Sequence, residues 1–215
     1  TKSKVKQFFY DKKRTLSISK AESQKNNIII MDDGFQDISI IKDLNIICFN
    51  SLDLIGNGFL LPAGPLREKF NKVKHCQIAV INGKRNIAFE KKLKSISNNI
   101  EIYQSKYLIK DFKRFRGKKI LAFAGIGNPE NFFDLLRDNG LKVKKEISFP
   151  DHYNYTKKEV ENLISKAKDE GLTLLTTEKD FFRIKQSGFK KINYVSVELK
   201  ISNSKSFEKV ILKNL

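Results

Sequence analysis

The sequence predicts an α/β fold with mainly parallel sheets. Short apolar runs rich in β-branched residues alternate along the chain with longer polar stretches of helical character. These runs are continuous rather than alternating, which is typical of strands covered on both faces and therefore of parallel sheets. The predicted strands are 28–31 (IIIM), 46–49 (IICF), 78–81 (IAVI), 120–124 (ILAFA) and 172–176 (LTLLT).

Two helices are predicted between these strands. The first covers 129–139, with Asn128 as its N-cap, Pro129 at its first position and Gly140 after its end. The second covers 156–170.

Capping and periodicity support the second helix. Thr156 and Glu159 form a capping box, an apolar stripe follows at helical spacing, and Gly171 ends the helix. The segment 174–180 (LLTTEKD) is predicted to be a strand that runs into a polar turn. A domain boundary is predicted in the basic stretch KRFRGKK, which gives domains 1–112 and 113–215.

Composition excludes several classes of protein. Hydrophobic residues make up 40% of the 215 residues, which is enough for a buried core and excludes wholesale disorder. Cys48 and Cys76 lie in apolar stretches and are expected to be buried reduced thiols, so a disulfide framework and a Cys-rich zinc site are excluded. No apolar run reaches the length of a membrane span, and no signal peptide is visible. Because the chain begins with Thr1 rather than Met, we expect it to be part of a longer protein.

The charge indicates an anionic partner. The 42 Lys and Arg against 24 Asp and Glu give a formal charge of +18, which favours nucleic acid, a nucleotide or an anionic membrane surface as a partner. The excess is spread along the chain and is mostly lysine, which argues against a specific nucleic-acid footprint. A basic α/β nucleic-acid-binding domain nevertheless stays open as an alternative.

Paired carboxylates follow the first predicted strand. Asp32 and Asp33 stand at its carboxyl end, outside which ligands bind in open α/β sheets. In nucleotide-hydrolysing folds, a carboxylate there holds the magnesium ion or polarises the attacking hydroxyl. Neighbours on a strand point to opposite faces, so the two carboxylates should have different roles. The alternative is an ordinary Asp-Gly turn.

Two glycine-containing loops are candidate anion sites. In the loop 56–68 (GNGFLLPAGPLRE), glycine and proline residues restrict the backbone tightly. Arg67 is the natural candidate in this loop to bind an anion. The alternative is a long connecting loop in which Arg67 is simply solvated. The loop after 120–124 (GIGNP) leads into a helix N-terminus, the geometry of an anion cradle. Tight strand-to-helix packing explains this second loop equally well.

His152 is the candidate proton-transfer histidine. It lies between Asp151 and Tyr153 immediately before a predicted helix, whereas His75 lies in a Lys-rich polar stretch and should be exposed. A carboxylate–imidazole couple tunes proton transfer near neutral pH. The alternative is a purely structural histidine.

Five segments together resemble one family, the tetraacyldisaccharide 4'-kinases of lipid A biosynthesis. They are DDGFQ (32–36), GNGFLLPAGPLRE (56–68), AFAGIGNPENFF (122–133), FPDHYNYT (149–156) and TTEKDFFRI (176–184). The resemblance implies a P-loop-kinase-like, three-layer α/β/α fold with two α/β domains, the first of them incomplete. It implies transfer of the γ-phosphate of ATP, with Mg²⁺, to the 4'-hydroxyl of tetraacyldisaccharide 1-phosphate, which gives lipid IVA. It also implies a peripheral protein on the anionic cytoplasmic face of the bacterial inner membrane, with no nucleic-acid partner.

The resemblance also implies roles for individual residues. Asp32 would be the base on the sugar hydroxyl, with His152 as its partner. Asp33 would reach magnesium, and Arg67 and Glu68 would lie at the substrate site.

The chain departs from the family in two places. The family's phosphate-binding P-loop lies upstream of DDGFQ, and the 31 residues that precede this motif here contain no G-x-x-x-x-G-K-[ST]. Asn50 also stands where family members usually have Asp. The residues that bind ATP are therefore left unassigned, and we expect the chain by itself to bind ATP poorly and not to turn over. A degenerate, non-catalytic homologue remains an alternative.

Overall fold

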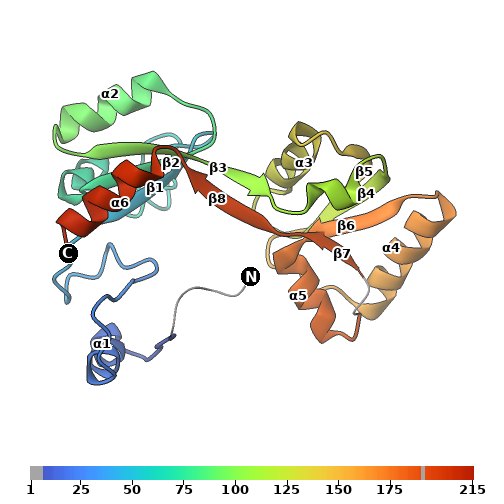
Figure 1. The fold of residues 1–215 in the computed structure, drawn as a ribbon, viewed down its shortest axis with the longest axis horizontal. Helices are drawn as coiled ribbons and strands as arrows, with labels where there is room; N and C mark the ends of the chain where they lie inside the picture. The colour runs from blue at the N-terminus through green and yellow to red at the C-terminus, as the bar shows by residue number, and fades with distance from the viewer. Residues whose placement is uncertain (1–6, 190–191) are drawn as a thin grey trace. The chain divides into compact units, whose positions relative to one another are not determined.

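The computed structural model describes residues 7–189 and 192–215, which form two compact units (Figure 1). Unit 1 contains the chain up to Ser105 together with Ile201–Leu215, and unit 2 contains Lys106–Lys200. The chain passes into unit 2 within strand β3 (Glu101–Ile109) and returns within strand β8 (Val197–Ile201).

The sheet of unit 1 has the strand order β1-β2-β3-β8, in which β1, β2 and β3 are parallel. Its other elements are α1 (Arg14–Ser23), β1 (Ile46–Asn50), the 3-10 helix η1 (Phe70–His75), β2 (Ile78–Asn82), α2 (Ile87–Ile96) and α6 (Ser204–Lys213).

Helices cover both faces of this sheet. On one face Ala79 and Ile81 of β2 pack with α2 and η1, and on the other Ile78 and Val80 pack with α6. The ring of Phe207 on α6 meets Tyr103 edge to face at 5.2 Å between centroids.

The contacts of α6 explain where the units differ from the domains predicted from the sequence. A single boundary at 112/113 assigns the C-terminal segment to the second domain, whereas the structure packs Ile201–Leu215 with unit 1. The apolar face of α6 covers β2 and β3, so the chain must return to unit 1 to bury this side of the sheet.

The sheet of unit 2 has the order β5-β4-β6-β7, and each of these pairs is parallel. Its elements are η2 (Phe112–Phe115), β4 (Lys119–Ala124), α3 (Pro129–Asp138), β5 (Lys142–Ser148), α4 (Lys157–Asp169), β6 (Thr173–Thr177), α5 (Glu178–Gln186) and β7 (Asn193–Val195).

Strand β4 lies at the centre of unit 2 and is buried on both faces. Ile120 and Ala122 pack with α3 on one face, while Leu121 and Phe123 pack with α4 and α5 on the other. Unit 2 is thus a three-layer α/β/α arrangement, and the predicted α/β class with mainly parallel sheets is confirmed.

The helix signals of the sequence are confirmed in unit 2. Asn128 caps α3 by accepting a hydrogen bond from the amide of Asn131, and Pro129 is the first residue of the helix. At α4, Thr156 and Glu159 form the complete capping box.

The strand predicted at 28–31 is wrong. These residues form no strand, and Ile28, Ile29 and Ile30 are 58%, 40% and 83% exposed. An isoleucine run becomes a buried strand only where neighbouring strands and helices cover it, and none of the strands in the described part of the chain pairs with this segment.

Two smaller expectations also change. The polar turn predicted at the end of 174–180 is the first turn of α5, which begins at Glu178 with Thr177 as its N-cap. Cys76 is buried as expected, but Cys48 is exposed. Cys48 shares its face of β1 with the exposed Ile46, whereas Phe49 on the opposite face is buried, so β1 is covered on one side only.

Candidate functional site

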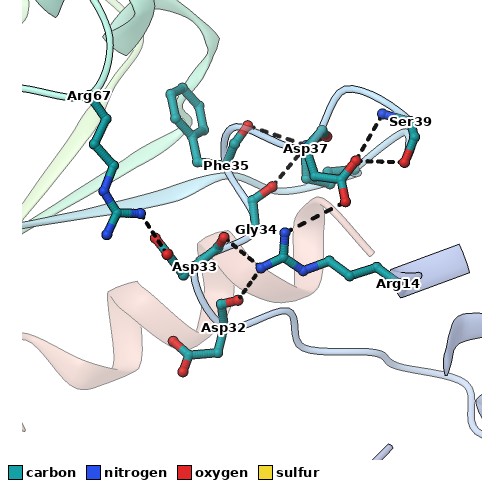
Figure 2. A network of polar contacts seen from close by, with 9 residues as sticks. Arg14, Asp32, Asp33, Gly34, Phe35, Asp37, Ser39 and Arg67 are labelled. Carbon is teal, nitrogen blue, oxygen red and sulfur yellow. Dashed lines mark hydrogen bonds and ion pairs between the residues drawn. The ribbon is translucent and has the colours of Figure 1, made fainter. Parts of the chain in front are cut away.

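The aspartate pair lies in a turn of unit 1 that is held by a guanidinium group (Figure 2). Nη2 of Arg14 on α1 donates to the main-chain oxygens of Asp32 (3.2 Å) and Asp33 (2.9 Å). Nη1 of the same side chain lies 3.6 Å from Oδ2 of Asp37. The turn is therefore held through its backbone, which leaves both aspartate side chains free for other contacts.

A second cation fixes the far side of this turn. Nζ of Lys42 donates to the main-chain oxygens of Gly34, at 3.2 Å, and of Asp37. The ring of Phe35 packs against the buried cluster around Phe49, which attaches the turn to the core of unit 1.

The two aspartates have different surroundings, although they lie in a turn and not at the end of a strand. Nη1 of Arg67 donates to Oδ2 of Asp33 at 2.6 Å, and the pKa of Asp33 is lowered from its ordinary 3.8 first by this hydrogen bond and then by the charge of Arg67. Asp32 turns its carboxylate away from both arginines in Figure 2, and within the described residues this carboxylate has no hydrogen bond or ion pair. The turn thus offers one paired and one open carboxylate.

The Gly/Pro-rich loop presents Arg67 to the turn. Within it, the side chain of Asn57 donates to the oxygen of Ala63 and accepts from the amide of Phe59. A Cβ at Gly64 would lie 2.2 Å from Oδ1 of Asn57 and 2.4 Å from the oxygen of Phe59, so only glycine fits there. Arg67 follows this fixed loop, and because it pairs with Asp33 it is not simply solvated.

Glu68 is less exposed than its neighbour Arg67. It is half-buried, and its negative charge adds to the burial that raises the pKa of Cys76 to about 11. The structure thus associates Glu68 with a buried thiol of the core and Arg67 with the aspartate turn.

The second candidate site lies in unit 2, around the loop after β4. Gly125 donates its amide to Oδ2 of Asp180 at 3.0 Å, and its oxygen accepts from Nη1 of Arg183 at 2.8 Å. Asp180 is fully buried at 0% exposure, and Oγ1 of Thr177 also donates to its Oδ2 at 2.8 Å. The predicted anion cradle therefore holds a carboxylate of this same chain.

His152 stands beside this cluster. Its Nε2 lies 3.8 Å from Oδ2 of Asp151, which is longer than a hydrogen bond, so the carboxylate–imidazole couple stays a prediction. Its Nδ1 lies 3.1 Å from Nη2 of Arg183. The imidazole side chain is 71% exposed and its backbone is left-handed, with φ at 58°.

Asp180 and Arg183 carried no functional assignment in the sequence. Their signal was local, because Thr177 and Asp180 have the spacing of a helix cap and Asp180 and Arg183 are three residues apart on α5. What the sequence did not show is that this helix start meets the Gly125 loop, 55 residues earlier in the chain.

The predicted site residues are divided between the units. Asp32, Asp33, Arg67 and Glu68 belong to unit 1, and His152 belongs to unit 2. Across residues 7–189 and 192–215, no group of three or more His, Cys, Asp or Glu side chains is placed to hold a metal ion. Nor is any helix in this part of the chain long and apolar enough to cross a membrane.

Relatives of this chain among known proteins share one description. A tetraacyldisaccharide 4'-kinase of Pelagibacter ubique is 38% identical over 208 residues, which cover 95% of this chain and 66% of the relative. One of Rickettsia akari is 37% identical over 88% of this chain and 57% of its own length. A crystal structure of LpxK from Aquifex aeolicus in complex with ATP is 24% identical with a TM-score of 0.62, covers 92% of this chain and 61% of its own, and shares its fold.

The matches cover most of this chain but only part of each relative. This chain spans 66% of the length of the Pelagibacter relative and 52% of one from Rhodopseudomonas palustris. The family model described as "Tetraacyldisaccharide-1-P 4'-kinase" matches residues 3–215, which is nearly the whole chain. A match of this extent shows that the chain belongs to the tetraacyldisaccharide-1-P 4'-kinase family.

Proposed function

We propose that this chain is part of an ATP-dependent kinase that phosphorylates the 4'-hydroxyl of tetraacyldisaccharide 1-phosphate, which forms lipid IVA. Family membership over residues 3–215 supports the reaction class. The observation that carries the proposal is the difference between the two aspartates of the turn. Arg67 pairs with Asp33, whereas the carboxylate of Asp32 is open.

Asp32 is the proposed base. Phosphoryl transfer needs a positioned hydroxyl, a group that accepts its proton, and cationic groups around the phosphates. An aspartate held by its backbone and free at its side chain meets the second need, because its oxygen can approach a substrate hydroxyl without first breaking an ion pair.

His152 is the proposed partner of Asp32 in proton transfer. Its ring is 71% exposed and therefore accessible to a substrate. Imidazole exchanges protons near neutral pH, which suits a group that assists a carboxylate base. Since the two residues lie in different units, their partnership is a prediction for the working enzyme.

Magnesium and ATP are the proposed cofactors. Mg²⁺ commonly takes one or two protein carboxylates and completes its shell with water and phosphate oxygens, so the aspartate turn fits a metal site that the nucleotide completes. A magnesium ion held there would neutralise charge that develops on the transferred phosphoryl group. Asp33 is the proposed ligand, and Arg67 is its counter-charge before the metal and nucleotide bind.

The proposed substrate site includes Arg67 and Glu68, and the proposed location is the cytoplasmic face of the bacterial inner membrane. A phosphorylated lipid and an anionic leaflet both match a chain with a formal charge of +18. Each basic residue near such a surface adds roughly 1 kcal/mol of attraction, which salt screens. The 215 residues contain no phosphate-binding G-x-x-x-x-G-K-[ST] motif, so we expect turnover only in the full-length protein that includes this chain.

The test is ATP-dependent 4'-phosphorylation of the disaccharide 1-phosphate lipid by that full-length protein. Asp32→Asn and His152→Ala should each lower kcat by a factor of about 100 or more, as expected for loss of proton-transfer groups. Asp43→Asn is the matched control, because Asp43 is an exposed aspartate of the same unit. An active enzyme whose Asp32 variant is unimpaired would refute the assignment of the base, and an inactive, folded full-length protein would favour a degenerate homologue.

A further inference from the structure

We propose that Arg183 is a positioning residue for His152, which it holds in one orientation and in the tautomer that carries the ring proton on Nε2. The importance of this arrangement for phosphoryl transfer rests on the proposed function. The arrangement itself rests only on contacts within unit 2.

The support for Arg183 begins with the buried carboxylate of Asp180. Asp180 is 0% exposed, and its Oδ2 accepts from the amide of Gly125 and from Oγ1 of Thr177. Its Oδ1 accepts from Nη1 of Arg183 at 3.1 Å. A buried carboxylate is tolerated only when it is paired and hydrogen-bonded in this way, so Asp180 is a firm anchor for the arginine.

Arg183 is held at a second point as well. Its Nη1 also donates to the main-chain oxygen of Gly125 at 2.8 Å, and its side chain is 21% exposed. With Nη1 occupied by these two acceptors, the planar guanidinium directs Nη2 toward Nδ1 of His152 at 3.1 Å. A lysine has a single nitrogen on a flexible stem and cannot make these contacts in the same geometry.

The chemistry of this contact decides the tautomer. A guanidinium has only donors, so Nδ1 of His152 must be the acceptor. A neutral imidazole has one donor and one acceptor nitrogen, which puts its proton on Nε2. That proton then faces Oδ2 of Asp151, 3.8 Å from Nε2.

The backbone supports the same orientation. His152 has a φ of 58°, a conformation that non-glycine residues seldom adopt, and its amide donates to Oδ1 of Asp151 at 2.9 Å. Asp151 therefore holds the residue at its amide and faces Nε2, while Arg183 holds the ring at Nδ1. An exposed histidine without such contacts would rotate and exchange between its two tautomers.

The test reads the tautomer directly by NMR of the 215-residue chain with ¹⁵N-labelled histidine. The sequence has two histidines, so His75→Gln leaves His152 as the single imidazole. Long-range ¹H–¹⁵N spectra are recorded at about pH 8.5, well above the usual imidazole pKa of ~6.5. We expect one nitrogen with the shift of a protonated site, assigned to Nε2, and one with the shift of an unprotonated acceptor, assigned to Nδ1.

Two substitutions and a control complete the experiment. Arg183→Met removes the donors, and Arg183→Lys keeps a cation next to Asp180 if the methionine variant does not fold. In either variant the two ring nitrogens should move toward averaged shifts. Arg137→Met is the control, because Arg137 is an arginine of the same unit that pairs with Asp134 and Glu146 and not with His152. A wild-type ring that is protonated on Nδ1 or already averaged would overturn the proposal, and so would unchanged shifts in Arg183→Lys.

Kinetics of the full-length kinase separate this proposal from the proposed function. Arg183→Lys should lower kcat by about 100-fold while KM changes little, as expected for a displaced catalytic group. Added to His152→Ala it should have no further effect on kcat. If the full-length protein has no kinase activity, the proposed function fails while the NMR result still decides the role of Arg183. A further loss of kcat in the double variant would show that Arg183 acts independently of His152.

Discussion

Gly125→Ala is the substitution whose effect follows most directly from the geometry of unit 2. A Cβ at this position would lie 2.7 Å from the hydroxyl oxygen of Tyr155, 3.1 Å from Cβ of Tyr153 and 3.3 Å from the oxygen of Pro150. The backbone of Gly125 is not left-handed, so the penalty is steric rather than conformational.

Tyr155 has little freedom to retreat from the added methyl group. It is 6% exposed, and its ring lies among those of Phe123, Phe149 and Tyr153, with centroids 5.7, 5.0 and 5.3 Å away. A displacement of several tenths of an ångström would therefore pass into this aromatic cluster. Overpacking of a tight core costs about 1–3 kcal/mol, and we expect Gly125→Ala to lower the free energy of unfolding by this amount.

Thermal unfolding followed by near-UV circular dichroism of the tyrosines is the assay. For a chain of 215 residues each kcal/mol lowers the midpoint by ~2–4 °C. Gly127→Ala in the same loop is the matched control, because the nearest atom to its added Cβ is Oδ2 of Asp151 at 3.4 Å. It should change stability by less than ~0.5 kcal/mol.

A double substitution tests the cause of the effect. The hydroxyl of Tyr155 is buried and makes no hydrogen bond of ordinary geometry within the described residues, although burial and then the nearby carboxylate of Asp180 raise its pKa. Tyr155→Phe alone should therefore cost no more than about 1 kcal/mol. In the Gly125→Ala background it should restore part of the lost stability, because it removes the closest contact. Equal losses for the two glycine variants, or no recovery with phenylalanine, would refute the steric explanation.

Two further predictions concern unit 1. Burial raises the pKa of both thiols, that of Cys76 to about 11, but Cys48 is exposed and Cys76 is buried. At about pH 8 iodoacetamide should therefore alkylate Cys48 in the folded chain and reach Cys76 only after unfolding. Mass spectrometry of the digested chain measures this, and equal rates would contradict the burial of Cys76. Arg67→Met should raise the pKa of Asp33 toward its ordinary 3.8, because the substitution removes the hydrogen bond and the charge that lower this pKa. In the unsubstituted chain the Arg67–Asp33 pair stabilises the fold at neutral pH, and this contribution is lost as the pH falls through the lowered pKa of Asp33. Carboxyl ¹³C titration gives this pKa, and an unchanged value in Arg67→Met would show that the ion pair does not form in solution.

The central strands and two helices of this fold were predictable from local patterns. Strands β2, β4 and β6 each contain a buried apolar run, and α3 and α4 carry cap residues that each accept from an amide of the first turn. In these elements, local preference and tertiary burial agree.

The edge strand β5 lacked an apolar run that could predict it from the sequence. Strand β5 (KVKKEIS) is mostly exposed and carries three lysines, so its pairing with β4 gives it strand structure without an apolar run. The exposed isoleucines at 28–30 show the opposite case, in which strong β-propensity forms no strand because no described strand pairs with the segment.

The sequence by itself determined the α/β class, the family motifs and the residue types of both candidate sites, because turns, caps and apolar periodicity are local properties of a chain. Only the tertiary structure decided how these residues are paired. It joined Arg67 to Asp33 across 34 residues and Asp180 to Gly125 across 55, and it placed Arg183 against Nδ1 of His152. Such contacts depend on the packing of elements far apart in the chain, and no local pattern specifies which distant donor will meet a given acceptor.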